Sequence, residues 1–226
     1  MGRKTRILIA DDHAMVREGT RKLLEQETDF EVVAEVADGE AAVEAARQLA
    51  PDIALIDVAM PRMDGIEATR RIKAECPNTT VLILSAYDDD QFIFSLLEAG
   101  AAGYLLKRAQ SRELVASIRA VSEGESVLDP SILRKVMTRF APSRARAPAA
   151  EPGSPELTER ELKILQLMTR GLGNKEIAAA LNLSIRTIQT HVGQIFEKLN
   201  VSSRTEAVVL ALKKNLVTLD TPSSVG

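Results

Sequence analysis

Five polar residues in the first half of the chain have the types and spacing that phosphoryl chemistry requires. Each of them ends or follows a short apolar run: Asp11, Asp12, Asp57, Ser85 and Lys107. Three clustered carboxylates repel one another unless a cation lies among them, and hard oxygen ligands suit Mg²⁺. A carboxylate can attack phosphorus, while a lysine and a hydroxyl can hold the phosphoryl oxygens. If these residues meet, they can form an aspartyl phosphate.

Alternating apolar runs and helical patterns are the elements that would bring these residues together. The runs begin near Arg6, Glu31, Ile53, Thr80 and Gly103. Helical patterns cover residues 14–27, 39–49, 65–75, 89–99 and 111–124. This alternation predicts an α/β fold with a doubly wound, five-stranded parallel sheet. Because sites in such sheets form at the carboxyl ends of the strands, the five polar residues should converge there. Any one of them alone could be a solvated loop residue, but their placement at corresponding positions favours a site.

The motifs around these residues resemble those of a known family. The pattern Asp11-Asp12, Asp57-x-x-Met60-Pro61-x-Met63-Asp64-Gly65, Ser85-Ala86 and Lys107 is similar to that of the CheY-like receiver domain, over about residues 5–122.

The resemblance implies a role for each residue of the pattern. Asp57 would accept the phosphoryl group, and Asp12, Asp57 and the backbone carbonyl of Ala59 would ligate Mg²⁺, with Asp11 acting mainly through water. Ser85 and Lys107 would hold the phosphoryl oxygens, and Tyr104 stands at the position of the family's switch aromatic.

One departure concerns the residue after the lysine, where the family often has proline. Arg108 stands there, so a cis-proline is not available to shape that loop. The NarL-like subgroup commonly lacks this proline, so we do not interpret the departure as a loss of function.

A phosphatase of the haloacid-dehalogenase type is the nearest enzyme alternative, because it also uses an aspartate nucleophile. That chemistry usually needs a second aspartate two residues later as general acid, and position 59 is alanine. We therefore expect no enzyme activity beyond Mg²⁺-dependent self-phosphorylation and slow autodephosphorylation of Asp57.

The alternation ends after Gly124. Residues 123–156 are predicted to hold an extra helix at Ser131–Phe140 and then a flexible linker, because residues 141–155 contain four of the nine prolines.

The last part of the chain has only helical patterns. Thr158 and Glu161 have the spacing of a capping box, Asn174 and Ser184 can cap the next two helices, and a further helix covers roughly residues 203–214. In Ile185–Leu199, a stripe predicted to be buried consists of Ile185, Ile188, Val192, Ile195 and Leu199. The opposite face is polar. The pattern alone fits a helix-turn-helix and a surface helix of a small bundle equally well.

Further motifs in this region resemble the LuxR-type helix-turn-helix, over about residues 157–216. They are Leu157–Glu161, Gly171–Ala178, Leu183-Ser184-x-x-Thr187-Ile188-x-x-His191-Val192, Lys198-Leu199-x-Val201 and Arg204-Thr205. Together with the receiver motifs, they identify the chain as similar to the NarL/FixJ response regulators. The resemblance implies that Ile185–Leu199 enters the DNA major groove and that the last helix forms a dimer contact.

The resemblance also implies which side chains contact DNA. Base readout would fall to Gln189, Thr190 and Gly193, and contacts to phosphates to Lys175, Arg186 and Thr187. Gln189 stands where lysine is frequent and Gly193 where a longer polar residue is frequent, so we expect a shallower salt dependence than in relatives. Gly193 also weakens the helix by up to about 1 kcal/mol relative to alanine.

Charge and composition agree with two different tasks. Residues 1–141 carry 18 Lys and Arg against 24 Asp and Glu, whereas residues 158–226 carry 9 against 6. Only the second region has the sign that suits a phosphate backbone. The single Cys76 excludes an intrachain disulfide, and no apolar stretch is long enough to cross a membrane. We therefore expect a cytoplasmic protein.

Two histidines and an acidic run complete the candidate residues. His13 is interpreted as a helix start and His191 as a packing or phosphate-contact residue, rather than as metal ligands. Asp88–Asp90 is interpreted as the cap of the following helix.

The expected mechanism is a phosphoryl transfer from a sensor histidine kinase to Asp57, followed by dimerisation and DNA binding. A constitutive DNA binder, whose receiver is only a protein-interaction module, is the alternative.

Overall fold

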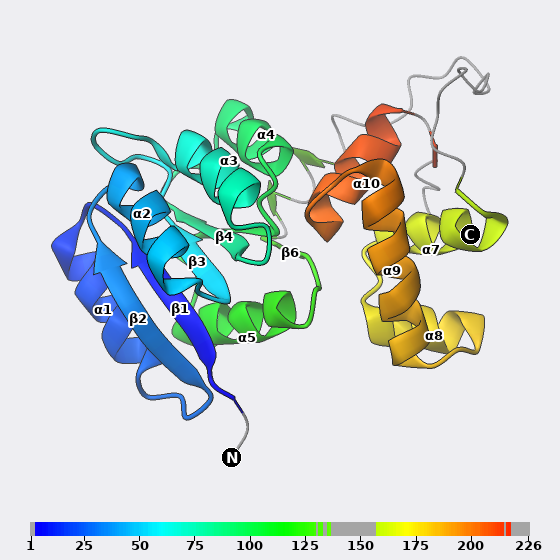
Figure 1. Cartoon of the computed structure of the whole chain (residues 1–226), viewed down its shortest axis with the longest axis horizontal. Helices are drawn as coiled ribbons and strands as arrows, with labels where there is room; N and C mark the ends of the chain where they lie inside the picture. The colour runs from blue at the N-terminus through cyan, green and yellow to red at the C-terminus, as the bar shows by residue number, and fades with distance from the viewer. Residues whose placement is uncertain (1–2, 130, 133–134, 137–156, 215, 218–226) are drawn as a thin grey trace, which may run out of the picture. The chain divides into compact units, whose positions relative to one another are not determined.

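The computed structural model describes residues 3–129, 131–132, 135–136, 157–214 and 216–217. Contacts divide the chain into two compact units, Met1–Ile132 and Leu133–Gly226 (Figure 1). The first contains the sheet and the second is helical in its described part.

The first unit is built on a parallel sheet. Its strands are β1 (Thr5–Ala10), β2 (Phe30–Val36), β3 (Ile53–Ile56), β4 (Thr80–Ser85), β5 (Gly103–Leu106) and β6 (Val127–Leu128). The spatial order is β2-β1-β3-β4-β5-β6, with every neighbouring pair parallel. Strands β3 and β5 are buried along their whole length, as expected for a sheet covered on both faces.

The predicted number of strands was wrong. In the described part of this unit the sheet has six strands rather than five, because Val127 and Leu128 pair with Gly103 and Tyr104 of β5. A strand of two residues is too short to produce a recognisable sequence period. It continues the edge of the sheet beside β5, the strand that precedes Lys107.

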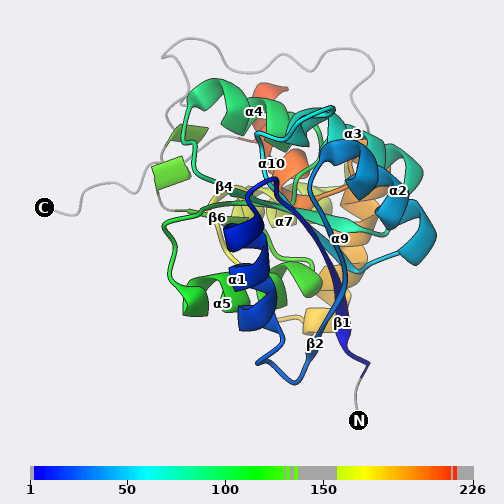
Figure 2. The same ribbon diagram turned by 90° about the vertical axis from the view of Figure 1, so that its left-hand side faces the viewer.

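Five helices cover the two faces of the sheet. They are α1 (Ala14–Leu24), α2 (Gly39–Leu49), α3 (Gly65–Glu75), α4 (Asp90–Glu98) and α5 (Ser111–Ser122). Figures 1 and 2 show α2, α3 and α4 on one face and α1 and α5 on the other. Leu24 of α1 and Leu114, Ile118 and Val121 of α5 join Ile7, Leu55 and Leu82 of the strands in one buried cluster.

The extra helix and the linker lie largely outside the described residues. Of Ser131–Phe140, the structure describes Ser131, Ile132, Lys135 and Val136, and these four are helical. The predicted linker at residues 141–155 is not described.

Four helices lie within residues 157–214: α7 (Glu159–Thr169), α8 (Asn174–Leu181), α9 (Ile185–Leu199) and α10 (Arg204–Lys213). Thr158 and Glu161 form the capping box of α7, and the Ser184 side chain caps α9 by accepting from the Thr187 N–H. Gly171 has a φ of 81°, the left-handed conformation that ends α7. Helices α7 and α9 thus begin directly after the residues that were predicted to cap them.

Two assignments in the helical unit were wrong. Gly173, not Asn174, is the cap of α8; Asn174 is buried, and its side-chain oxygen accepts from Nη1 of the buried Arg204 at 3.0 Å. Ile185 is 46% exposed, so the buried stripe of α9 consists of Ile188, Val192, Ile195 and Leu199. Position 185 is the first residue of the helix, where fewer neighbours surround a side chain.

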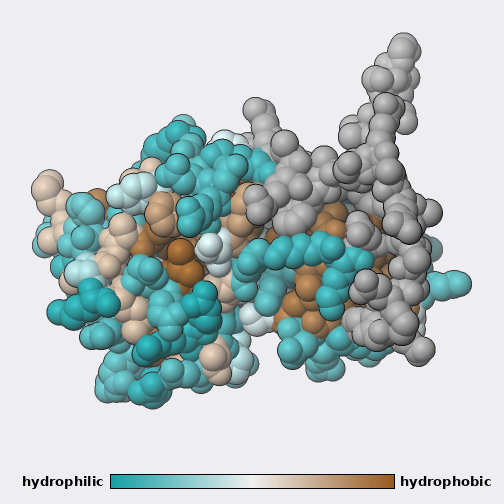
Figure 3. Space-filling model, turned by 90° about the horizontal axis from the view of Figure 1, so that it is seen from above, coloured by the Kyte–Doolittle hydropathy of each residue, from teal (hydrophilic) through white to brown (hydrophobic). Residues whose placement is uncertain are grey.

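Hydrophilic side chains occupy much of the face drawn in Figure 3. None of the helices in the described ranges is long and apolar enough to span a membrane.

Gly65 is expected to be required for the fold, because α3 begins directly against the end of β3. A Cβ at Gly65 would lie 2.2 Å from the carbonyl oxygen of Asp57. We predict that Gly65→Ala lowers the free energy of unfolding by about 1–3 kcal/mol, measured by urea denaturation. Gly19→Ala is the matched control: a Cβ there meets nothing within 4 Å, and the variant should gain up to about 1 kcal/mol. Equal effects of both variants would contradict this account.

Candidate phosphorylation site and nucleic-acid interface

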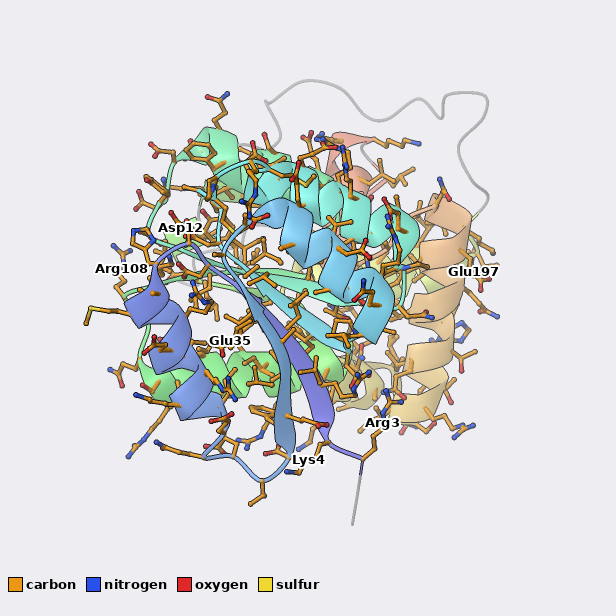
Figure 4. The ribbon with its side chains drawn as sticks, turned by 60° about the vertical axis from the view of Figure 1, so that its left-hand side comes forward. Arg3, Lys4, Asp12, Glu35, Arg108 and Glu197 are labelled. Atoms are coloured by element: carbon orange, nitrogen blue, oxygen red, sulfur yellow. The ribbon has the colours of Figure 1, made fainter. Side chains whose placement is uncertain are left out.

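The five polar residues predicted to form a site do converge at the carboxyl ends of the strands. Asp11 and Asp12 follow β1, Asp57 follows β3, Ser85 ends β4 and Lys107 follows β5. Figure 4 shows Asp12 and Arg108 at this end of the sheet and Arg3 and Lys4 at the opposite end.

Backbone hydrogen bonds hold these residues in register beyond the regular strands. The Asp57 N–H donates to the Ala10 carbonyl at 2.9 Å, and the Lys107 N–H donates to the Ser85 carbonyl at 2.7 Å. The strands therefore fix the positions from which the functional side chains start.

Lys107 lies between two buried carboxylates. Its Nζ is 2.7 Å from Oδ2 of Asp57 and 2.8 Å from Oδ2 of Asp11. Asp57 is 3% exposed and Asp11 is 4% exposed. The other oxygen of Asp57, Oδ1, accepts the Val58 N–H at 2.7 Å. Both oxygens of Asp57 thus have donors, and its carboxylate has a fixed orientation.

A group of potential metal ligands surrounds Asp57. One ligand atom from each of Asp11, Asp12, His13 and Asp57 lies within 4.8 Å of the others. Asp12 is exposed, and Ala59, whose carbonyl completes the predicted ligand set, is also exposed. Three carboxylates and a carbonyl are the oxygen donors that a hard divalent cation prefers. The residues present therefore fit a divalent cation.

The loop after β4 is tied to the sheet through Tyr87. Its N–H donates to Oγ of the fully buried Ser85 at 3.1 Å, and its carbonyl accepts the hydroxyl of Tyr104 at 2.9 Å. The Tyr104 ring is fully buried. Two of the predicted phosphate-binding and switch residues are thus joined through a backbone position that sequence reasoning missed, because a backbone contact leaves no signal in residue types.

The predicted DNA-contacting side chains in the helical unit lie mostly on its surface. Lys175, Arg186, Gln189, Thr190 and Gly193 are exposed. Thr187 is half-buried, and its hydroxyl shares a 2.8 Å hydrogen bond with the Ser184 hydroxyl.

The face of α9 opposite its buried stripe thus carries three of the predicted base-reading positions. The Thr190 hydroxyl donates to the Arg186 carbonyl at 3.0 Å, which holds it along the helix. This face is free to approach a ligand as far as the helical unit itself is concerned.

Comparisons with known proteins match both regions of the chain. The model of the response regulator receiver domain matches residues 7–119, and that of the bacterial regulatory proteins of the luxR family matches residues 155–211. The response regulator protein VraR of Staphylococcus aureus is 41% identical over 212 residues, which cover 94% of this chain and 98% of VraR. This chain is a luxR-family response regulator. The two-domain resemblance inferred from the motifs is confirmed.

Solved structures are similar to this response regulator over nearly its whole length. The crystal structure of the response regulator ChrA in a heme-sensing two-component system is 36% identical, with a TM-score of 0.51, and the match covers 95% of this chain and 99% of ChrA. A structure of two RcsB dimers bound to two parallel DNAs is 26% identical, with a TM-score of 0.55, and covers 93% of this chain and 98% of RcsB.

The electrostatics of the receiver pocket follow from burial and from the shared lysine. Burial raises the pKa of Asp57, and the hydrogen bond from Lys107 opposes this effect without cancelling it. Burial acts to lower the pKa of Lys107, but its hydrogen bonds to Asp11 and Asp57 outweigh burial and leave that pKa raised. Lys107 therefore stays charged, while burial disfavours the ionised form of Asp57.

The loop after β3 in this response regulator is clamped to the start of α2. Arg62, with a φ of 65°, forms an ion pair with the buried Asp38. The Gly39 N–H donates to the Met63 carbonyl at 3.2 Å. A Cβ at Gly39 would lie 2.4 Å from that carbonyl oxygen, so glycine is required for this close approach. The clamp holds the loop that contains Ala59.

The two histidines have different surroundings. Nδ1 of His13 lies 2.7 Å from Oδ1 of Asp12 and is thus part of the acidic group, which the interpretation as a helix start did not include. His191 lies on α9, and its Nδ1 is buried without a hydrogen-bond partner among the described residues.

Lys107→Ala is predicted to destabilise the receiver by about 3–5 kcal/mol at pH 7, because it leaves two buried carboxylates without their cation. Since the folded-state pKa of Asp57 is already raised, the folded state binds its proton more tightly than the unfolded state does. The loss should therefore shrink as the pH falls through that pKa. Urea denaturation of the wild type and of Lys107→Ala between pH 7 and pH 5 measures this difference in the free energy of unfolding. A loss that grows toward pH 5 would contradict this electrostatic explanation. Lys22→Ala, on an exposed position of α1, is the control.

Proposed function

We propose that this response regulator accepts a phosphoryl group on Asp57 from a sensor histidine kinase and, once phosphorylated, dimerises and binds DNA to regulate transcription. The observation that carries the proposal is the position of Asp57. It is buried at the carboxyl end of β3, 2.7 Å from Nζ of Lys107 and within the group of acidic side chains.

The carboxylate of Asp57 is the nucleophile of the proposed transfer. Its oxygen forms a bond to phosphorus while the bond from phosphorus to a nitrogen of the kinase histidine breaks, and the released imidazole takes up a proton. Lys107 holds a positive charge beside the incoming phosphoryl oxygens, and the hydroxyl of Ser85 can donate to one of them.

Mg²⁺ is the proposed cofactor, held by the carboxylates of Asp12 and Asp57 and the carbonyl of Ala59, with Asp11 acting through water. When bound, Mg²⁺ neutralises charge on the transferring phosphoryl group. We assign no enzyme activity beyond self-phosphorylation and slow autodephosphorylation, because the general acid that a phosphatase of the aspartate-nucleophile type needs is replaced by Ala59.

The proposed switch runs from Ser85 to Tyr104 through Tyr87. In this switch, the Ser85 hydroxyl turns to donate a hydrogen bond to a phosphoryl oxygen. The Tyr87 N–H, which donates to that hydroxyl oxygen here, then changes its partner. Because the Tyr87 carbonyl holds the Tyr104 hydroxyl, the same movement alters how Tyr104 packs. The region that responds is the start of α4, which directly follows this loop.

The proposed DNA contacts lie on α9 and the start of α8. Gln189, Thr190 and Gly193 read bases, and Lys175, Arg186 and Thr187 position the backbone. RcsB, a similar protein, is described as dimers bound to DNA, which supports homodimers on paired half-sites about one helical turn apart. A DNA target also supports a cytoplasmic location.

Labelling with acetyl phosphate and Mg²⁺ tests the phosphoacceptor. We expect mass spectrometry to find one phosphoryl group on Asp57 of the full chain and none in Asp57→Asn. Asp89→Asn is the matched control, because Asp89 precedes α4 without a side-chain capping hydrogen bond, and this variant should be labelled like the wild type. A label that persists in Asp57→Asn would refute the assignment.

Fluorescence anisotropy with operator DNA tests the interface. We predict that Gln189→Ala costs about 1–3 kcal/mol against the preferred site and relaxes specificity, while Arg186→Ala weakens binding to all sequences and lowers the salt slope by about 1. The exposed Lys163→Ala on α7 is the control. Equal affinity with and without phosphorylation would favour a constitutive DNA binder.

A further inference from the structure

We propose that the imidazole of His13 is a nitrogen ligand of the divalent cation in the receiver pocket, which raises the affinity of the site for later transition-metal ions such as Co²⁺. The inference rests on the proposed function, since it assumes that the pocket binds a divalent cation. It adds a ligand and a metal preference that an all-oxygen pocket lacks.

The first support is the distance between His13 and both preceding aspartates. Nδ1 of His13 lies 2.7 Å from Oδ1 of Asp12 and 3.5 Å from Oδ1 of Asp11. Neighbouring ligand atoms on an octahedral cation with bonds of about 2.1 Å are about 3 Å apart. The separation of the imidazole nitrogen from the Asp12 oxygen is therefore close to that of two ligand atoms on one cation.

The second support is the backbone that holds His13. It is the cap residue of α1, with extended φ and ψ of −82° and 103°, yet its side chain makes no capping hydrogen bond. Its own N–H donates to Oδ1 of Asp11 at 2.9 Å, and Nη1 of Arg17 donates to the Asp11 carbonyl at 2.7 Å. Hydrogen bonds that do not involve the imidazole thus fix the turn, and the imidazole is not needed to start the helix.

The third support is access from solvent. The side chain of His13 is 65% exposed and that of Asp12 is 34% exposed, whereas Asp11 and Asp57 are buried. A cation that enters from solvent meets Asp12 and His13 first and then the buried carboxylates. His13 therefore lies on the open side of the ligand group.

The chemistry of the ligands indicates how His13 would change the metal preference of the site. Carboxylate and carbonyl oxygens suit Mg²⁺ and Mn²⁺, while imidazole suits the later divalent metals. A mixed set of the Asp12 and Asp57 carboxylates, the Ala59 carbonyl and one imidazole therefore gains affinity for Co²⁺. If the imidazole only donated a hydrogen bond to Asp12, it would orient that carboxylate for every cation alike.

Pulsed electron paramagnetic resonance of the Mn²⁺-loaded full chain tests the ligation directly. We expect a ¹⁴N hyperfine coupling from a histidine nitrogen in the wild type and its loss in His13→Gln. The sequence contains two histidines, so His191→Gln is the matched control and should retain the coupling. A wild type without the coupling, or a coupling that survives in His13→Gln, would overturn the proposal.

Calorimetric titration tests the metal preference. His13→Gln should weaken Co²⁺ binding by roughly ten-fold while Mg²⁺ binding changes by less than about two-fold. Equal losses for both ions would overturn the preference.

Labelling of Asp57 by acetyl phosphate with Mg²⁺ distinguishes a failure of the His13 proposal from a failure of the proposed function. If Asp57 is labelled but Mn²⁺ shows no nitrogen coupling, the His13 ligand alone is refuted. If no divalent cation binds and Asp57 is not labelled, the proposed function fails as well.

Discussion

A single partly buried lysine between two buried carboxylates is the interaction on which the receiver unit depends. Lys107 lies within 2.8 Å of oxygens from both Asp11 and Asp57, and one positive charge cannot balance both of them and Asp12. A buried charge without a partner costs several kcal/mol. The sheet holds these groups together through the register of β1, β3 and β5, so the excess negative charge is a fixed property of the fold. A divalent cation or a phosphoryl group with its cation can then bind with charge compensation that the folded chain lacks.

Contacts made by the surrounding loops connect the pocket to other parts of the unit. Tyr87 is bonded at its N–H to Ser85 and at its carbonyl to Tyr104, so one residue joins the pocket edge to a fully buried ring. On the other side, Arg62 and Gly39 fix the loop after β3 against α2. One side of the pocket is thus clamped by an ion pair to a buried carboxylate and by a close backbone approach. The other side is held by two hydrogen bonds. The second side is the one that a new ligand of Ser85 can change.

The sequence predicted most elements because their signals are long or chemically distinct. Helices α2, α3 and α9 begin and end where their helical patterns indicated. The five pocket residues converge, as residues at the strand ends of a parallel sheet must. Three features escaped for physical reasons. The strand Val127–Leu128 is too short to have a period, and Ile185 follows the apolar spacing of α9 but lies at its exposed first turn. The place of His13 beside Asp12 depends on a rotamer, which spacing along the chain does not specify.

The charge distribution of α9 explains why dimerisation would matter to a regulator of this kind. Its two cationic side chains are Arg186 and Lys198, and Nζ of Lys198 lies 2.7 Å from the buried carboxylate of Glu161 on α7. That ion pair ties α9 to the core of the helical unit and neutralises half of the helix's positive charge, while Glu197 is exposed on the same helix. Because phosphate contacts supply most of the affinity of a DNA-binding unit, one unit alone should bind weakly. Two linked units bind with an added effective concentration, so whatever controls their pairing also controls occupancy of the DNA.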